Sequence, residues 1–164
     1  MYAIFDNKFA KAMAELCSKA DIILPNITEA CFMTDTEFVS GLHTEEYIET
    51  LLNKLLDMGA KNVILTGVTF EEDKLGAAFM GQDRVAKYYF QKRLPGMYHG
   101  TGDVFASSFC GAVLNGISYY DAMGIAARYV CDCIKRTQSM DNPITYGVDF
   151  ERGIPFYIKE LGKI

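Results

Sequence analysis

Two short apolar runs, each preceded by a segment of helical periodicity, constrain the fold of this chain most. Residues 21–25 read Asp-Ile-Ile-Leu-Pro, and residues 63–66 read Val-Ile-Leu-Thr. A short apolar run bounded by proline or glycine is typical of a strand buried on both faces of a parallel sheet. Apolar residues recur at helical spacing before each run, in residues 6–20 and in residues 45–58. The order helix, strand, helix, strand predicts parallel βα units and therefore an α/β fold.

The pattern changes in the second half of the chain. Residues 77–80 and 85–90 flank a Gly-Gln-Asp-Arg turn, and they predict a β-hairpin. Four more elements are predicted downstream: helices over residues 103–114 and 119–136, an edge strand over residues 146–150 and a helix over residues 155–161. A chain of 164 residues, half of them apolar, suffices for one core, so we expect a single domain over residues 1–164.

Composition narrows the classes of function. The net charge is -5 and no basic stripe is visible, which argues against a nucleic-acid partner. Five cysteines without a C-x-x-C pair, beside only two histidines, argue against a structural zinc site and favour free thiols in a reducing compartment. No apolar run reaches membrane-spanning length and no signal-peptide pattern opens the chain, so we expect a cytoplasmic protein without a membrane partner.

The most distinctive stretch is His-Gly-Thr-Gly-Asp at residues 99–103, which runs into a helix of small and apolar residues. Gly100 and Gly102 would let a ligand approach the main chain, and the first N–H groups of the helix would be open to a phosphate. Asp103 is then either a helix cap or a catalytic base. A helix N-terminus favours the ionised carboxylate, which could take a proton from an alcohol as the bond to phosphorus forms.

Two further candidates follow the predicted strands. Asn26 and Glu29 come after the first strand, where an amide and a carboxylate would suit water-mediated Mg²⁺ on a nucleotide phosphate. The alternative is structural, with Asn26 as a turn residue and Glu29 as a solvated charge at a helix start. Thr66 and Gly67 end the second strand, where they could contact phosphate or form a simple exit from the strand into a loop.

Taken in order, these motifs resemble a known family. P-N-x-x-E after one strand, T-G after the next, a hairpin, and then H-G-T-G-D-V-F-A-S-S-F-x-G resemble the ribokinase-like small-molecule kinases, and within them the pyridoxal/pyridoxine kinases. The similarity runs through nearly the whole chain, including the late Tyr-Gly-Val-x-Phe-Glu at residues 146–151. It implies a three-layer α/β/α sandwich with a mostly parallel sheet and a β-hairpin. The implied reaction transfers the γ-phosphoryl group of ATP to the 5′-hydroxymethyl group of pyridoxal, pyridoxine or pyridoxamine.

The resemblance also assigns roles to residues and implies Mg²⁺, with a monovalent cation as a further option. Asp103 would be the catalytic base, and the amides of Gly100, Thr101 and Gly102 would form the anion hole. Asn26 and Glu29 would order the Mg²⁺–phosphate assembly, with Glu29 acting through water. Thr66 and Gly67 would lie along the ATP phosphates. Positioning and charge neutralisation are what phosphoryl transfer requires, so this set of residues is chemically sensible.

One departure from the family is its length. Family members are considerably longer, and this chain resembles their C-terminal, nucleotide-binding half, so we expect a truncated sandwich and an impaired enzyme. The predicted strands would then expose an apolar edge, which favours a homo-oligomer or pairing with a separate N-terminal half. Two alternatives stay open: a non-catalytic nucleotide-binding or partner-binding module, and a related kinase for hydroxymethylpyrimidine or a sugar.

Overall fold

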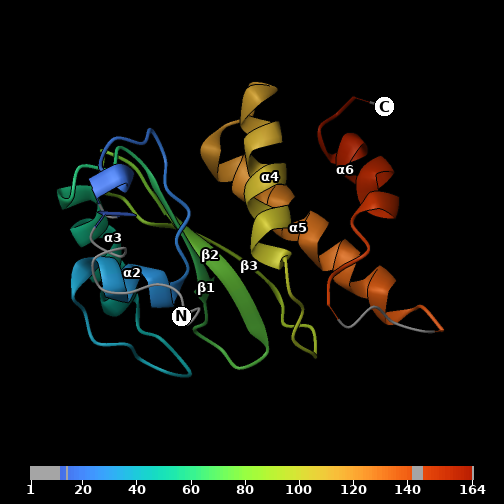
Figure 1. Cartoon of the computed structure of the whole chain (residues 1–164), viewed down its shortest axis with the longest axis horizontal. Helices are drawn as coiled ribbons and strands as arrows, with labels where there is room; N and C mark the ends of the chain where they lie inside the picture. The colour runs from blue at the N-terminus through green and yellow to red at the C-terminus, as the bar shows by residue number, and fades with distance from the viewer. Residues whose placement is uncertain (1–11, 14, 142–145, 164) are drawn as a thin grey trace. The chain divides into compact units, whose positions relative to one another are not determined.

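The computed structural model describes residues 12–13, 15–141 and 146–163, and these divide into two compact units (Figure 1). The first unit is Met1–Tyr88 and the second is Tyr89–Ile164. The α/β class predicted from the sequence is confirmed, while the three-layer arrangement and the single domain stay predictions. Within the described residues, no helix is both long enough and apolar enough to cross a membrane.

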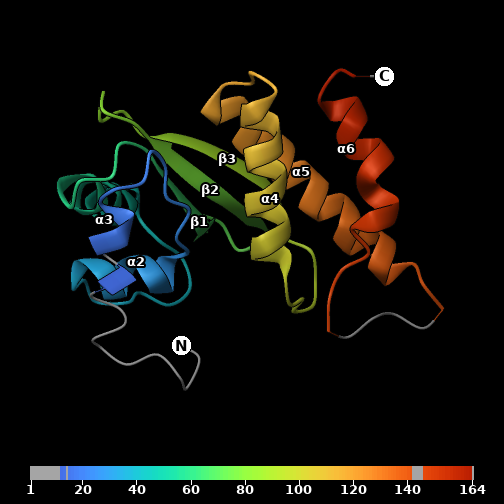
Figure 2. The ribbon, with the colours of Figure 1, turned by 45° about the horizontal axis from the view of Figure 1, so that its top comes forward.

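In the first unit, helices α2 (Ile27–Thr34) and α3 (Glu45–Asp57) pack against each other and against strand β1 (Val63–Val68) (Figures 1 and 2). The predicted helix over residues 45–58 is confirmed with its stripe, since Ile48, Leu51, Leu52 and Leu55 are fully buried. Each such side chain contributes roughly 1.5–3 kcal/mol of burial energy. This stripe and the buried residues of β1 form the core of the unit.

The sheet has the strand order β1-β2-β3, where β2 is Lys74–Met80 and β3 is Lys87–Lys92. The boundary between the two units falls within β3. Strands β2 and β3 are neighbours around a turn in which Arg84 N–H donates to the Gly81 carbonyl at 3.0 Å, as the hairpin prediction required. The prediction of a mostly parallel sheet is wrong, because β1 and β2 are antiparallel, with Val63 opposite Met80. Only residues 69–73 connect these two strands, and a parallel crossover needs a dozen or more residues.

The predicted parallel strand over residues 22–24 is present only as two isolated bridges. Ile23 bridges Val63 and Asn26 bridges Thr66, both in the parallel sense. Pro25 lies between them and has no N–H to donate, which interrupts the ladder. The predicted helix over residues 6–20 is described at residues 12–13 and 15–20. Residues 12–13 and 15–17 are helical, residues 18–20 are not, and the start of the predicted helix lies outside the described residues.

The second unit consists of α4 (Thr101–Leu114), α5 (Tyr119–Gln138), the short 3₁₀ helix η1 (Glu151–Gly153) and α6 (Ile154–Glu160). Helices α4 and α5 pack against each other through small and apolar buried residues, among them Ala112, Ala122 and Ala126 (Figure 2). The α6 residue Tyr157 donates its hydroxyl hydrogen to the Ser108 carbonyl of α4 at 2.6 Å. Gly111 makes that approach possible, since a Cβ there would collide with the Tyr157 hydroxyl.

The predicted terminal helix is confirmed as α6, but the predicted edge strand over residues 146–150 is wrong. Where this segment is described, it is bent or irregular, and side chains of α5 take its backbone hydrogen bonds. Asp149 N–H donates to the Thr137 hydroxyl at 2.8 Å, and the Tyr129 hydroxyl donates to the Phe150 carbonyl at 2.6 Å. These contacts replace the ladder that a strand would need.

Candidate functional site

The start of α4 leaves its backbone open. Gly100 is the N-cap and adopts a left-handed conformation, with φ 77° and ψ 0°, and no side chain caps the helix through it. The Val104 N–H donates to the Gly100 carbonyl at 3.0 Å and closes the first turn. The N–H groups of the three residues between them have no acceptor within the helix. They carry the positive end of the helix dipole, which attracts an anion.

The space in front of this turn is open. A Cβ built on Gly100 or on Gly102 would meet no atom of the described residues within 4 Å. The Thr101 hydroxyl donates to the Tyr98 carbonyl at 3.3 Å, which ties the loop to the helix start. Together these features form a surface on which a phosphate group could approach the backbone, so the residues present fit the anion hole that the sequence predicts.

Asp103 occupies the third helical position of α4 and is exposed. Across the described parts of the chain, no hydrogen bond or ion pair engages its carboxylate. The sequence left two readings of Asp103, a cap or a base. The N-cap position belongs to Gly100, and the Asp103 carboxylate closes no capping box. The carboxylate is therefore available for chemistry, and its role as a base stays a prediction.

Asn26 and Glu29 form a reciprocal capping box at the start of α2. The Glu29 N–H donates to Asn26 Oδ1 at 2.9 Å, and the Asn26 N–H donates to Glu29 Oε2 at 2.9 Å. This is the structural alternative that the sequence left open, in a more specific form. Both residues are exposed, and Glu29 Oε1 takes no part in the box. One carboxylate oxygen therefore stays available to a water or a ligand.

Thr66 and Gly67 lie beside Asn26 at the end of β1. Asn26 bridges Thr66 directly, and the Thr66 N–H donates to the Pro25 carbonyl at 2.9 Å. Gly67 is exposed at a φ of 85°, where the pairing of β1 with β2 is irregular between Thr66 and Val68. Such a bulge leaves one residue out of the ladder, and glycine tolerates the positive φ.

The structure therefore brings together two of the three predicted motifs. We call Asn26, Glu29, Thr66 and Gly67 the strand-end group; all four lie in the first unit. We call Gly100, Thr101, Gly102 and Asp103 the helix-start group; these four lie in the second unit.

One contact behind the strand-end group could not be predicted from the sequence. His43, in the loop before α3, makes two hydrogen bonds with Thr69. Its backbone N–H donates to the Thr69 carbonyl at 2.7 Å, and its ring Nδ1 accepts the Thr69 N–H at 3.1 Å. The ring stacks on Tyr47 with centroids 5.7 Å apart and planes at 13°. Burial lowers the pKa of His43 below its ordinary value, so the ring is neutral at neutral pH.

A dedicated metal centre is not formed by protein ligands alone within the described residues, where no group of three or more His, Cys, Asp or Glu side chains converges. A Mg²⁺ ion usually keeps several waters and uses one or two carboxylates together with substrate phosphates. The free oxygen of Glu29 fits that kind of indirect contact.

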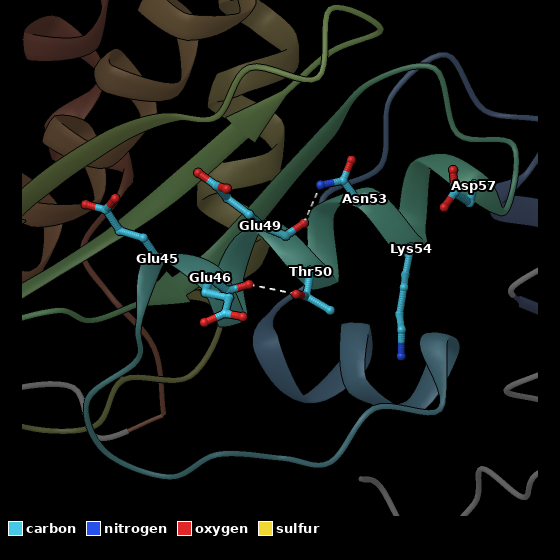
Figure 3. A pocket seen from close by; sticks show the side chains of 7 residues that line it. All are labelled: Glu45, Glu46, Glu49, Thr50, Asn53, Lys54 and Asp57. Atoms are coloured by element: carbon cyan, nitrogen blue, oxygen red, sulfur yellow. Dashed lines mark hydrogen bonds between the residues drawn. The ribbon is translucent and has the colours of Figure 1, made fainter.

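A shallow hollow on the first unit lies apart from the predicted motifs. It runs along the exposed face of α3, as Figure 3 shows, and is lined by Glu45, Glu46, Glu49, Thr50, Asn53, Lys54 and Asp57. The dashed contacts in Figure 3 are hydrogen bonds within the helix, from Thr50 to the Glu46 carbonyl and from Asn53 to the Glu49 carbonyl. Four carboxylates would repel a phosphate, so this hollow is not a candidate for nucleotide binding.

Comparison with known proteins gives a consistent result. A family model described as phosphomethylpyrimidine kinase matches residues 2–146. A hydroxymethylpyrimidine/phosphomethylpyrimidine kinase of Mycobacterium tuberculosis is 28% identical over 123 residues, which are 74% of this chain and 43% of that protein.

Solved structures of similar proteins agree. A Bacteroides thetaiotaomicron protein assigned as a phosphomethylpyrimidine kinase, crystallised with pyridoxal, is 29% identical with a TM-score of 0.87, and the match covers 96% of this chain and 56% of that one. The pyridoxal kinase of Lactobacillus plantarum is 27% identical with a TM-score of 0.84, over 97% of this chain and 56% of that one. The chain thus spans about half the length of these proteins.

Proposed function

The chain belongs to the phosphomethylpyrimidine kinase family, and from that membership we propose that it forms the nucleotide-binding part of an ATP-dependent kinase. The acceptor is the hydroxymethyl group of a small nitrogen-containing aromatic ring. Pyridoxal and pyridoxine are the substrates that we favour, in line with the resemblance of the motifs and the likeness to the Lactobacillus plantarum pyridoxal kinase.

The observation that carries the proposal is that Asp103, in the first turn of a helix capped by glycine, has a carboxylate without a hydrogen bond or ion pair among the described residues. In the proposed reaction, the alcohol oxygen of the substrate attacks the γ-phosphorus of ATP and its proton passes to Asp103. The new oxygen–phosphorus bond forms as the bond to the ADP oxygen breaks, and ADP leaves with that electron pair. The open N–H groups at the helix start would stabilise charge on the phosphoryl group in transfer.

The strand-end group supports the nucleotide side of this proposal. The half-buried Thr66, whose hydroxyl donates to the Pro25 carbonyl at 3.4 Å, and the exposed, bulged Gly67 are suited to contact the ATP phosphates. Glu29 would act through water with its one free oxygen, because Oε2 is held by the capping box with Asn26. When bound, Mg²⁺ would neutralise charge on the β- and γ-phosphates.

A second candidate substrate is hydroxymethylpyrimidine. The Mycobacterium tuberculosis relative favours it, since its description names hydroxymethylpyrimidine, and the description of the matching family model names the related phosphomethylpyrimidine. Both candidates present a hydroxymethyl group on a flat nitrogen heterocycle, so the helix-start group would serve either one.

The proposal is tested by titrating the chain with Mg-ATP in a calorimeter and by following amide shifts in the NMR spectrum. We expect binding, with shifts concentrated at Gly67 and at Gly100–Asp103. Turnover is then measured with pyridoxal, pyridoxine and hydroxymethylpyrimidine under identical conditions, and the highest kcat/KM identifies the substrate. Absence of both a heat signal and shifts at these residues would favour a non-catalytic module with a purely structural glycine loop.

A further inference from the structure

The backbone that follows Gly67 is held from one side by His43. The two hydrogen bonds between His43 and Thr69, at 2.7 and 3.1 Å, run in opposite directions and fix both polar groups of the Thr69 peptide backbone. Thr69 is 2% exposed and lies two residues after Gly67. A buried N–H that loses its acceptor costs free energy, so the bond to the His43 ring nitrogen stabilises this backbone.

His43 itself is firmly held. Its ring stacks on Tyr47, the third residue of α3, and the Tyr47 hydroxyl forms several hydrogen bonds under the loop before α3. That hydroxyl donates to the Glu37 carbonyl at 3.0 Å and accepts the Val39 N–H at 3.3 Å. The ring position of His43 is thereby tied to the rigid helix α3. The low pKa caused by burial keeps Nδ1 unprotonated and able to accept.

The other side of the same turn is held by the segment before α2. The Thr66 N–H donates to the Pro25 carbonyl at 2.9 Å, and Asn26 bridges Thr66. The exposed Gly67 therefore lies between two anchors, Pro25 on one side and His43 on the other. A bulged glycine with a φ of 85° has wide conformational freedom, so anchors on both sides are what restrict it to one geometry.

We propose that His43 is a positioning residue for the strand-end group: through Thr69 it holds the Thr66–Gly67 turn in the geometry that meets the nucleotide phosphates. The phosphate in this statement rests on the proposed function, whereas the hold on the turn does not. His43 does not touch the ligand. Its contribution is to order the turn before binding, which lowers the entropic cost of the contact.

Two substitutions separate the parts of the His43 side chain. His43→Asn keeps a hydrogen-bond acceptor near the position of Nδ1 and loses the ring. His43→Phe keeps the stacking on Tyr47 and loses the acceptor. If His43 acts only through packing, His43→Phe should disturb the Thr66–Gly67 turn less than His43→Asn. If His43 acts as proposed, His43→Asn should disturb the turn less than His43→Phe. Circular dichroism of both variants verifies that they fold.

The first readout is amide hydrogen exchange at Gly67 and Thr69, measured without nucleotide. Loss of one hydrogen bond corresponds to exchange roughly two- to tenfold faster in His43→Phe, and His43→Asn should remain near the wild type. Equal exchange in all three proteins, or faster exchange in His43→Asn than in His43→Phe, would overturn the inference.

The second readout is the dissociation constant for Mg-ATP. We expect a rise of roughly two- to tenfold in His43→Phe and little change in His43→Asn, with kcat at saturating ATP unchanged in both. A wild-type chain that does not bind Mg-ATP would refute the proposed function and the phosphate contact with it, while the exchange data would still decide whether His43 holds the turn. A lowered kcat with unchanged ATP affinity would also contradict the inference.

Discussion

The starts of α2 and α4 carry an acidic residue at the same helical position and use it differently. In α2, Glu29 closes a capping box with Asn26, so one carboxylate oxygen and two backbone N–H groups are satisfied within the helix start. In α4, the N-cap is Gly100, which has no side chain to reciprocate. The Asp103 carboxylate and the first N–H groups therefore both stay open, which is the combination that phosphoryl transfer needs.

A third helix start confirms that the N-cap residue decides the outcome. In α5, the Asp121 N–H donates to the Ser118 hydroxyl at 3.2 Å, and that hydroxyl donates to the Asp121 carboxylate at 2.6 Å. An acidic residue at the third position is thus a stabilising element where the N-cap has a polar side chain. It becomes a candidate for chemistry where the N-cap is glycine.

The largest effect in this comparison is expected from Asp103→Asn. A positioned general base contributes roughly 10²- to 10⁴-fold to rate, so turnover with the preferred substrate should fall by about that factor. The free energy of unfolding should fall by only about 0.3–1 kcal/mol, from the lost interaction with the helix dipole, because Asp103 is exposed and has no partner among the described residues. Mg-ATP affinity, measured by calorimetry, should be retained or improved, since a negative charge is removed.

The matched control is Asp121→Asn, which changes the same helical position in α5. It removes the charged acceptor of the Ser118 hydroxyl, so it should lower the free energy of unfolding by about 0.5–1 kcal/mol and leave turnover intact. Equal turnover in the two variants would remove Asp103 from the role of base.

Gly100→Ala should have the next largest effect. A side chain at a φ of 77° costs about 1–2 kcal/mol, so urea denaturation should show a loss of that size. Relief of the strain would move the N-cap out of its left-handed conformation, and Mg-ATP affinity should fall as well. Gly102→Ala is the control, because Gly102 is within the helix and, in the part of the chain that the structure describes, a Cβ there meets nothing within 4 Å. It should keep or slightly raise stability.

The fold could be predicted from the sequence where the residues of a helix or strand alone determine its structure. The apolar stripe of α3 and a strand over residues 63–66 were predictable, since the apolar pattern and the burial agree in both, and the observed strand extends to Val68. The antiparallel partner of β1 was not, because the first half of β2 contains Lys74 and Gly76 and lacks an apolar alternation. The segment 146–150 has a strand-like composition, and only its contacts with α5 show that its hydrogen bonds go to side chains.

In the candidate site too, some features could be predicted from the sequence and others only from the structure. The motifs could be located from sequence, and the position of Asp103 in the first turn follows from its neighbours. The reciprocal bonds of Asn26 and Glu29 could not be separated from a ligand role, because the pattern N-x-x-E serves both. The role of His43 as a hydrogen-bond acceptor could not be predicted, since it depends on Thr69, which is 26 residues away in the chain.

Asn26→Ala addresses the α2 side of the comparison. It removes the acceptor of the Glu29 N–H and leaves Glu29 without its reciprocal partner, so the free energy of unfolding should fall by about 1 kcal/mol. The loss should appear as faster amide exchange in the first turn of α2. Asn26→Ser retains a capping oxygen and should recover most of the stability; a loss as large as that of the alanine variant would contradict the capping interpretation.

Glu29→Gln gives the smallest expected change in stability. It separates the two roles of the Glu29 carboxylate, which are the capping bond to Asn26 and the proposed contact with hydrated Mg²⁺. A glutamine at this position can still accept the Asn26 N–H, so the capping box survives and the free energy of unfolding should change by only about 0.3 kcal/mol. The charge is lost, however. If the free oxygen of Glu29 orders hydrated Mg²⁺, the Mg²⁺ concentration for half-maximal turnover should rise by roughly three- to tenfold.

Glu29→Ala completes this last comparison, because it removes both the capping bond and the charge. It should show the same rise in the Mg²⁺ requirement as the glutamine variant, together with a stability loss of about 0.5–1 kcal/mol. If the glutamine variant keeps the wild-type Mg²⁺ dependence, the capping box is the whole function of Glu29. The start of α2 then only stabilises the fold, and the start of α4 remains the one proposed to carry the chemistry.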